Sequence, residues 1–135
     1  MHHLEPMFKH HPNAEGQRDG VLPCLDACHD CASSCLSCAD ACVSEARGAE
    51  LVRCIGSNWD CAAICVATAQ LLARSGDRDF GVLSAMLRAC VAACVDCAAQ
   101  CHEHAAQMDH CRICEEACHE CVAICRSLLG VPAEA

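Results

Sequence analysis

Cysteine is the residue type in this chain that is best equipped for chemistry, with 18 cysteines in 135 residues. From Val21 onward the cysteines recur in four runs. The runs are Cys24, Cys28, Cys31, Cys35, Cys38 and Cys42; Cys54, Cys61 and Cys65; Cys90, Cys94, Cys97 and Cys101; and Cys111, Cys114, Cys118, Cys121 and Cys125. Steps that alternate between three and four residues average about 3.5, which places the thiols on one face of an α-helix. As thiolates, such a face offers many ligands to a soft metal ion.

Three other uses of cysteine fit this pattern less well. A buried cysteine can act as a small apolar residue, but this explains one or two cysteines better than 18 at core positions. Cysteines three or four residues apart on a helix do not present good disulfide geometry. A redox relay of the Cys-x-x-Cys type needs only one such pair. Metal binding therefore becomes the preferred interpretation.

The charge of the thiolates indicates which metal suits the pattern. If all 18 cysteines ionise, they place a charge of −18 in a narrow interior. Zinc uses about four sulfurs per ion, so about four zinc ions would leave a charge of roughly −10 buried. One Cu(I) per thiolate would neutralise the interior, and soft thiolates favour Cu(I). Iron–sulfur clusters need cysteines grouped in fours, and an uninterrupted stripe is not divided in that way. A zinc or other soft-metal buffer of metallothionein type and a thiol redox protein remain as alternatives.

The cysteine stripes require helices that position them. The spacing predicts helices over about 22–47, 49–74, 78–105 and 110–129. No Gly or Pro marks the break near 105–109, but one uninterrupted helix would leave half of its cysteines without partners. Helices of this length with short links predict an all-α fold, an antiparallel up-down-up-down four-helix bundle with a cysteine-lined core.

Local signals mark the helix ends. Pro23 is tolerated in the first turn of the first helix, and Gly48 is expected to end that helix. Residues 75–76, Ser and Gly, are expected to stop the second helix, and Asp77 is a candidate N-cap for the third. Gly130 is expected to end the fourth.

The chain divides into one domain with short ends. Residues 1–20 are expected to form a His-rich tail or short lead-in, 21–130 the bundle and 131–135 a C-terminal tail. The first 20 residues carry no secretory signal, so we expect a cytoplasmic location, where thiols stay reduced. No run is apolar enough for a membrane span, and a net charge of −9 with three aromatic residues argues against nucleic acid.

The two ends of the predicted bundle differ in composition. One end is expected to hold an apolar plug made of Leu71, Leu72, Phe80, Val82, Leu83, Met86, Leu87, Leu128 and Leu129. The other end collects Cys42, Cys54, Cys101 and Cys111. His104 and His110 fall in phase with the cysteine stripe at that end, with Met108 between them. We therefore expect this end to be a mouth at which the two histidines bind incoming metal.

Other polar and apolar positions have plainer expected roles. His29, His102 and His119 each follow a cysteine directly and are expected to face solvent. Asn58 occupies the missing stripe position between Cys54 and Cys61, where it is expected either to bond the backbone or to touch a metal. A second apolar stripe is expected to form a bundle flank or a self-association face. It contains Val52, Ile55, Trp59 and Val66.

The cysteine rhythm resembles that of the bacterial copper storage proteins, in particular their cytosolic branch. The resemblance covers residues 21–130 and rests on the segments CLDACHDCASSCLSCADAC, CIGSNWDCAAIC, CVAACVDCAAQCHEH and CRICEEACHECVAIC. It implies a cysteine-lined four-helix bundle whose thiolates bind many Cu(I) ions, with His104 and His110 as mouth ligands. It also implies a homo-oligomer, often a tetramer.

Together these observations predict a cytoplasmic store of Cu(I) rather than an enzyme. No Ser–His–Asp pattern, phosphate-binding loop or paired-carboxylate site is evident. The expected cargo is several Cu(I) ions per chain, on the order of one per cysteine. The expected partners are copper ions, delivered or removed by a copper chaperone or a small thiol, with no nucleic acid and no membrane.

Overall fold

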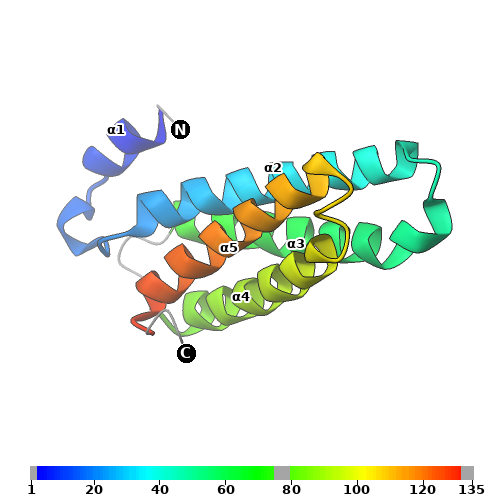
Figure 1. The fold of residues 1–135 in the computed structure, drawn as a ribbon. Coiled ribbons are helices and arrows are strands. Elements are labelled where there is room, and N and C mark those ends of the chain that lie inside the picture. Colours follow the sequence, from blue (N-terminus) through cyan, green and yellow to red (C-terminus); the bar gives the residue numbers. More distant parts are fainter. Residues whose placement is uncertain (1–2, 75–79, 132–135) are drawn as a thin grey trace.

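The computed structural model describes residues 3–74 and 80–131, which form helices and turns without a strand. Four long helices lie side by side in an elongated bundle (Figure 1). They are α2 (Val21–Ser44), α3 (Gly48–Ala73), α4 (Phe80–His102) and α5 (Asp109–Leu129). Each packs against two neighbours, in the cyclic order α2, α3, α4, α5 and back to α2. Successive helices run in opposite directions, so the predicted antiparallel bundle is confirmed.

The ends of α2 and α5 follow the expected capping chemistry, with one exception. Pro23 lies in the first turn of α2, as predicted. Gly130 ends α5 with a φ of 76°, in the left-handed region where glycine carries no steric penalty. Gly48 does not end the first helix, so that prediction is wrong. The backbone leaves α2 earlier, at Glu45, which is extended with a ψ of 155°, and Gly48 becomes the first residue of α3.

The break between α4 and α5 is confirmed where the hairpin was predicted. Residues 103–107 form turns, and Met108 precedes α5 with an extended backbone (φ −136°, ψ 118°). The Met108 side chain is only 5% exposed and belongs to the core. Burial of the Met108 side chain therefore stabilises this turn, although no Gly or Pro marks it in the sequence. The predicted stop at residues 75–76 and the N-cap at Asp77 lie outside the described residues.

The first 20 residues contain two short helical elements that the sequence did not predict. They are α1 (Leu4–Lys9) and a 3-10 turn, η1 (Ala14–Gly16). Figure 1 shows α1 beside the beginning of α2. Leu4 and Phe8, one helical turn apart, are half-buried and pack against the bundle core. This one-turn apolar pair is the signal from which the helix could have been predicted.

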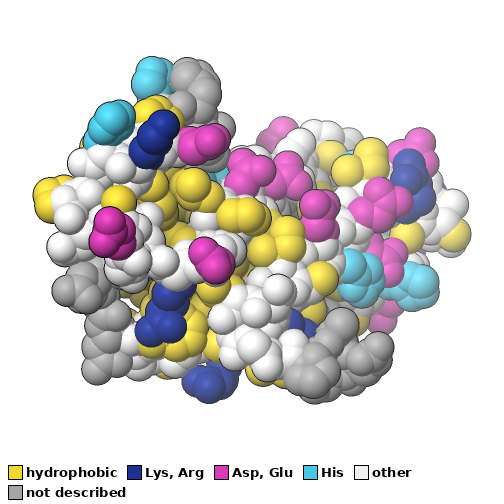
Figure 2. Space-filling model, turned by 90° about the vertical axis from the view of Figure 1, so that its left-hand side faces the viewer, with side chains coloured by type: hydrophobic (Ala, Val, Ile, Leu, Met, Phe, Trp, Pro, Cys, Tyr) yellow, Lys and Arg dark blue, Asp and Glu magenta, His cyan; other side chains and the backbone are white. Residues whose placement is uncertain are grey.

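The apolar end lies where the sequence placed it. Leu72, Leu83 and Leu87 are buried, and Leu71, Phe80, Leu128 and Leu129 are half-buried against them. Val21 and Leu25 complete the plug. Val82 was expected to belong to the plug, but it is 63% exposed. It lies one residue before the buried Leu83 and therefore on a different face of α4. Figure 2 looks onto this end and shows hydrophobic side chains gathered among acidic and basic ones.

Helix α4 is more apolar than the sequence analysis allowed. By length and composition alone it could cross a membrane. The expectation that no such run exists is therefore wrong for this helix. Its cysteine face packs in the bundle against α3 and α5. The small apolar residues between its cysteines, mainly Ala and Val, account for the high mean hydropathy.

Candidate metal centre

The 18 cysteines form one column of thiols along the bundle axis. All are free, and none is more than 2% exposed. Neighbouring Sγ atoms on different helices lie 3.6 to 4.0 Å apart. The column runs from Cys24 and Cys125, 3.8 Å apart beside the apolar plug, to Cys54 and Cys101, 3.8 Å apart near the α4–α5 turn. The stripes predicted on four separate helices thus meet in one core.

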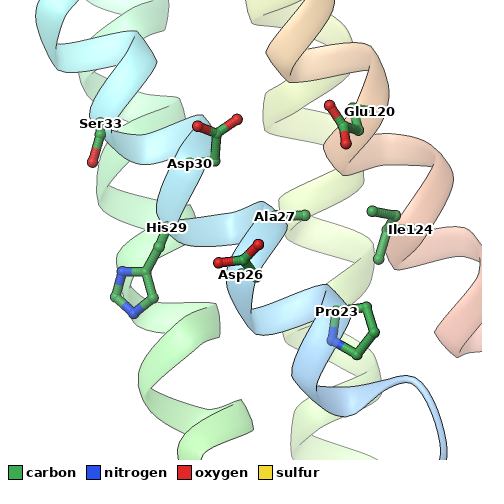
Figure 3. Close-up of a pocket in the computed structure, with 8 residues that line it drawn as sticks. All are labelled: Pro23, Asp26, Ala27, His29, Asp30, Ser33, Glu120 and Ile124. Carbon is green, nitrogen blue, oxygen red and sulfur yellow. The ribbon is translucent and has the colours of Figure 1, made fainter. Parts of the chain in front are cut away.

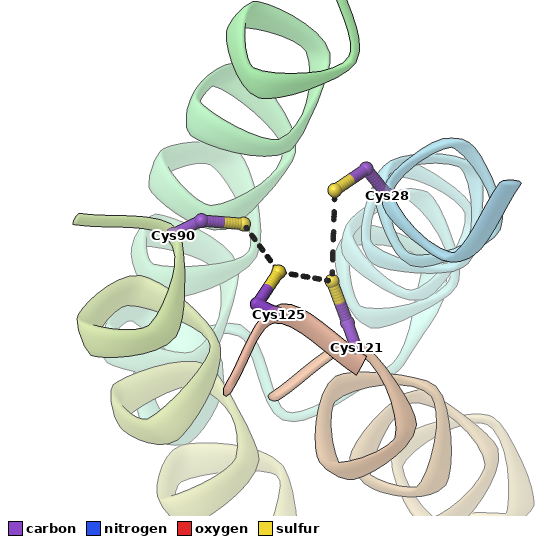
Figure 4. Close-up of side chains that lie close together, drawn as sticks. All are labelled: Cys28, Cys90, Cys121 and Cys125. Carbon is purple, nitrogen blue, oxygen red and sulfur yellow. Dashed lines mark hydrogen bonds between the residues drawn. The ribbon is translucent and has the colours of Figure 1, made fainter. Parts of the chain in front are cut away.

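Within the column, thiols gather in groups of four whose sulfurs all lie within 4.8 Å of one another. Figure 4 shows one group, in which Cys28 of α2, Cys90 of α4, and Cys121 and Cys125 of α5 point toward a common centre. Three further groups are Cys31, Cys65, Cys94 and Cys121; Cys31, Cys35, Cys61 and Cys118; and Cys35, Cys97, Cys114 and Cys118. Each of these groups takes residues from at least three helices, so the groups exist only in the folded bundle.

These groups overlap rather than standing apart. Cys31 and Cys35 each belong to two of them, and so does Cys121. One thiolate cannot fill a terminal position at two separate tetrahedral zinc sites, but it can bridge two Cu(I) ions that each take two or three sulfurs. The shared thiols therefore favour a continuous array of low-coordinate metal ions over isolated tetrahedral sites.

Asn58 occupies the gap in the α3 stripe and faces the thiols. Its side chain is fully buried. Its Oδ1 accepts hydrogen bonds from the Cys97 thiol at 3.0 Å and the Cys114 thiol at 3.3 Å, while its Nδ2 has no partner among the described residues. Of the two expected roles, backbone bonding does not match this geometry. The Asn58 amide instead occupies the position in the column where the helix period of α3 would place a nineteenth cysteine.

His110 joins the column to the surface. Its Nε2 lies 2.9 Å from the Glu45 carboxylate, and its Nδ1 lies 3.4 Å from the Cys38 Sγ and 3.6 Å from the Cys111 Sγ. A carboxylate only accepts hydrogen bonds, so Nε2 carries a proton, while Nδ1 faces the thiols and can bind a metal once it is unprotonated. Metal-binding histidines typically have such a carboxylate behind them. Cys38, Cys42, His110 and Cys111 form a mixed sulfur–nitrogen group within 4.8 Å.

Burial sets the protonation of this group. It raises the pKa of the Cys42 thiol to about 11 and also raises that of Cys111, and an ionised Cys38 beside them would add to both effects. Burial lowers the pKa of His110, but its hydrogen bonds with Cys38 and Glu45 outweigh this, so the pKa lies above its ordinary value. Burial therefore favours the protonated form of Cys42 and Cys111 in the metal-free protein, and a metal must displace those protons. Hydrogen bonds from Cys101, Cys114 and Cys54 instead lower the pKa of Cys38.

The second predicted mouth ligand, His104, is placed differently. It lies in the turn after α4 and is half-buried. Its backbone carbonyl accepts hydrogen bonds from Gln107 and Met108, and its ring makes no hydrogen bond within the described part of the chain. The structure thus brings His110 into contact with the thiols and leaves His104 near the same end without such a contact.

The remaining histidines behave as expected. His102 and His119 are mostly exposed and share the carboxylate of Glu115 at 2.9 and 3.3 Å. His29 is exposed on α2. The Glu115 carboxylate on the outer face of the bundle therefore explains the His102 and His119 rings without metal.

The second apolar stripe of α3 lies on the outer face of the helix. Val52 is 63% exposed, Trp59 57% and Val66 37%, with Ile55 half-buried beside them. The bundle alone leaves this face uncovered.

Comparison with known proteins decides the family. The family model for copper storage proteins matches residues 17–130, which include the whole thiol column. The chain belongs to the copper storage protein family.

Solved structures agree with this membership. The chain is 37% identical to the copper storage protein Ccsp of Streptomyces lividans loaded with ten copper equivalents, with a TM-score of 0.89 over 96% of this chain and 99% of that one. A structure of the cytosolic S. lividans protein with five coppers gives 41% identity and a TM-score of 0.81 over 84% and 95% of the two chains. The Cu(I)-bound copper storage protein BsCsp3 gives 30% identity and 0.71 over 82% and 98%. No curated protein matches the chain.

Proposed function

We propose that this copper storage protein holds many Cu(I) ions in the thiol column of its bundle, on the order of one per cysteine. The observation that carries the proposal is the overlap of four-thiol groups along one buried, continuous column. Isolated zinc or iron–sulfur sites would need cysteines that are not shared in this way.

The charge balance of the core supports monovalent copper. Each Cu(I) that replaces a thiol proton leaves the net charge of the core unchanged, because both ions carry a single positive charge. The bundle can therefore fill without burying uncompensated charge, which would be very costly. Divalent zinc would need two ionised thiols per ion for the same balance and four for its usual coordination, so a filled zinc core would retain negative charge.

The relatives support the same cargo and location. The S. lividans protein was solved with five coppers and after loading with ten copper equivalents, and it is described as cytosolic. We infer that this chain also works in the cytoplasm, as a store rather than an enzyme, and that a small thiol or a copper chaperone supplies and removes the metal. Its partner is copper, not nucleic acid or a membrane.

We propose that the metal ligands are the 18 cysteines together with His110, and that His104 is a second nitrogen donor at the same end. His110 rests on its contacts with Cys38 and Cys111. His104 rests on its place in the turn beside them.

Anomalous X-ray scattering at the copper edge would test the assignment. Crystals of the reduced protein would be loaded anaerobically with Cu(I), and a matched set would be loaded with Zn(II) and measured at the zinc edge. We expect copper peaks along the whole column, from Cys24 to His110, each beside two or three sulfurs. A few separate copper peaks with four sulfurs each, at the same positions as the zinc peaks, would favour the zinc-type alternative.

A further inference from the structure

Two histidines and a glutamate converge on the outer side of the α4–α5 pair. Nδ1 of His102 lies 2.9 Å from Oε2 of Glu115, and Nε2 of His119 lies 3.3 Å from the same oxygen. His102 is the last residue of α4, whereas Glu115 and His119 belong to α5. Three potential ligand atoms from two helices therefore gather around one oxygen, outside the thiol column.

The packing of the two helices holds this cluster together. Glu115 and His119 are four residues apart on α5, a spacing that places them on the same helix face. Helix α4 packs against α5, and the end of α4 comes beside Glu115. The Glu115 side chain is only 18% exposed, while His102 is 74% and His119 is 64% exposed. The carboxylate is thus held in place, and both rings stay accessible from solvent.

The separations of the three donor atoms suit a metal ion. Tetrahedral zinc binds nitrogen and oxygen at about 2.0–2.2 Å, which places its ligand atoms about 3.3–3.6 Å from one another. The nitrogen–oxygen distances of 2.9 and 3.3 Å are close to this range, and exposed rings can turn through the difference. Two imidazoles and one carboxylate are also a ligand set that proteins use for zinc, with the fourth position open.

The pairing of the rings with Glu115 needs no metal, but it is compatible with one. A divalent ion would replace the hydrogens that lie between the two rings and the carboxylate, and each neutral ring would keep its single proton on the other nitrogen. The ion and the carboxylate together would carry a charge of +1. The exposed Glu103 and Glu120, each next to one of the histidines in the sequence, favour such a charge.

A groove between α2 and α5 shows that carboxylates near a histidine are not enough. The groove has a volume of about 420 Å³, and its lining includes His29, Asp26, Asp30 and Glu120. Figure 3 shows the His29 ring turned away from Glu120, so its nitrogens and the carboxylates do not meet at one point. Convergence of the donor atoms distinguishes the Glu115 cluster from this groove.

We propose that His102, Glu115 and His119 form a surface site for a divalent ion of borderline softness such as Zn(II), separate from the thiol column. The site contains no sulfur, whereas Cu(I) prefers the thiolates of the core. The bound ion joins the end of α4 to α5 and keeps one position open to solvent. The proposal does not depend on which metal the thiol column stores.

The ring nitrogens report this site directly, even while the thiols also bind zinc. We would add Zn(II) to the reduced protein beyond saturation of its thiols and follow the nitrogen signals of the histidine rings by NMR. We expect Nδ1 of His102 and Nε2 of His119 to shift together, with one midpoint, before the His29 ring responds. Separate midpoints for the two rings, or a response no earlier than that of His29, would overturn the site.

Two neighbouring glutamates provide a matched pair of variants. Glu115→Gln removes the charge of the shared ligand and keeps its shape. It should raise the zinc concentration at the midpoint by about tenfold or more, because loss of even an indirect partner of a metal ligand costs about 10–100-fold in affinity. Glu116→Gln makes the same change where the carboxylate pairs with Arg112 at 3.1 Å, and it should keep the wild-type midpoint. Equal midpoints in the two variants would contradict the proposal.

Zinc-loaded crystals give a second readout. At the zinc edge we expect an anomalous peak about 2.0–2.2 Å from the three donor atoms in the wild-type protein, and no such peak in the double variant His102→Ala, His119→Ala. Circular dichroism verifies that the variant is folded. Wild-type crystals with zinc bound to their thiols but no peak beside Glu115 would overturn the surface site, whereas peaks within the column bear only on the storage function.

Discussion

At the residue scale, the His110 imidazole lies between the buried thiols and the surface of the bundle. Glu45 holds the proton of His110 on Nε2, so the opposite nitrogen is available to metal beside Cys38 and Cys111. Cys42 and Cys111 keep their protons because burial raises the pKa of both thiols. Copper uptake therefore releases protons, and affinity should rise with pH until the thiols are ionised.

The first prediction concerns this imidazole. His110→Ala removes a nitrogen ligand from the group of Cys38, Cys42 and Cys111. We expect the variant to hold about one Cu(I) fewer against a competing chelator, with the rest of the column unaffected. The count of chelator-resistant copper measures this.

The matched control is His119→Ala, which removes an exposed ring paired only with Glu115. Equal copper counts in the two histidine variants would show that His110 is not a ligand.

The second prediction concerns the gap in the stripe. Asn58 stands among Cys97, Cys101 and Cys114 without being a thiol. Asn58→Cys should therefore add about one Cu(I) per chain, because it completes the α3 stripe. Asn58→Ser, a small residue without a thiol, is the control. Native mass spectrometry of the loaded proteins gives both counts, and no gain in the Cys variant would contradict a continuous column.

At the element scale, each helix combines a cysteine face with a conventional apolar end. The helix period of the cysteines predicted the four helices, because no other regular element returns to one face after three or four residues. Their limits were less predictable. Gly48 begins α3 rather than ending α2, and the turn after α4 depends on the burial of Met108, which a local pattern does not reveal.

The third prediction separates folding from metal binding. Leu87 is fully buried in the apolar plug. Leu87→Ala should lower the free energy of unfolding of the metal-free protein by about 2–5 kcal/mol, because it leaves a cavity. The copper count should not change, because Leu87 lies in the apolar plug and is not a metal ligand.

Val82→Ala on the exposed face of α4 is the control, with an expected effect within about 0.5 kcal/mol. Chemical denaturation followed by circular dichroism measures both variants. A metal-free protein with no helical signal at all would contradict a preformed bundle.

At the scale of the whole molecule, one face of the bundle remains uncovered. Val52, Trp59 and Val66 form an exposed apolar stripe on α3. The sequence left open whether this stripe was a flank or an association face. Its exposure is compatible with both options, because the outer side of a bundle also faces solvent.

The fourth prediction follows from that stripe. We expect copies of the chain to associate through it, and Trp59→Arg to reduce the assembly, because a charge there cannot be buried without a partner. Sedimentation velocity measures the change. Val43→Arg, at a similarly exposed valine of α2, is the control, and identical sedimentation of the two variants would contradict this interface.

The sequence predicted the cargo chemistry better than the tertiary contacts around the thiols. Thiol number, phase and charge are local properties, so the cysteine core and the preference for Cu(I) could be predicted from them. The contact of His110 with the thiols also followed from its phase with Cys114. A surface groove beside Cys38 depends on how α2 and α5 meet, and the different contacts of His104 and His110 depend on the turn between α4 and α5. Such tertiary features have no sequence period.

The central claim is tested most directly by an anaerobic titration of the reduced, metal-free protein with Cu(I) against a competing chelator, with circular dichroism recorded in parallel. We expect tight uptake of about one Cu(I) per cysteine, with helicity already present before any metal is added. Saturation at only four or five ions per chain, or helicity that appears only with metal, would contradict a preformed thiolate store of copper.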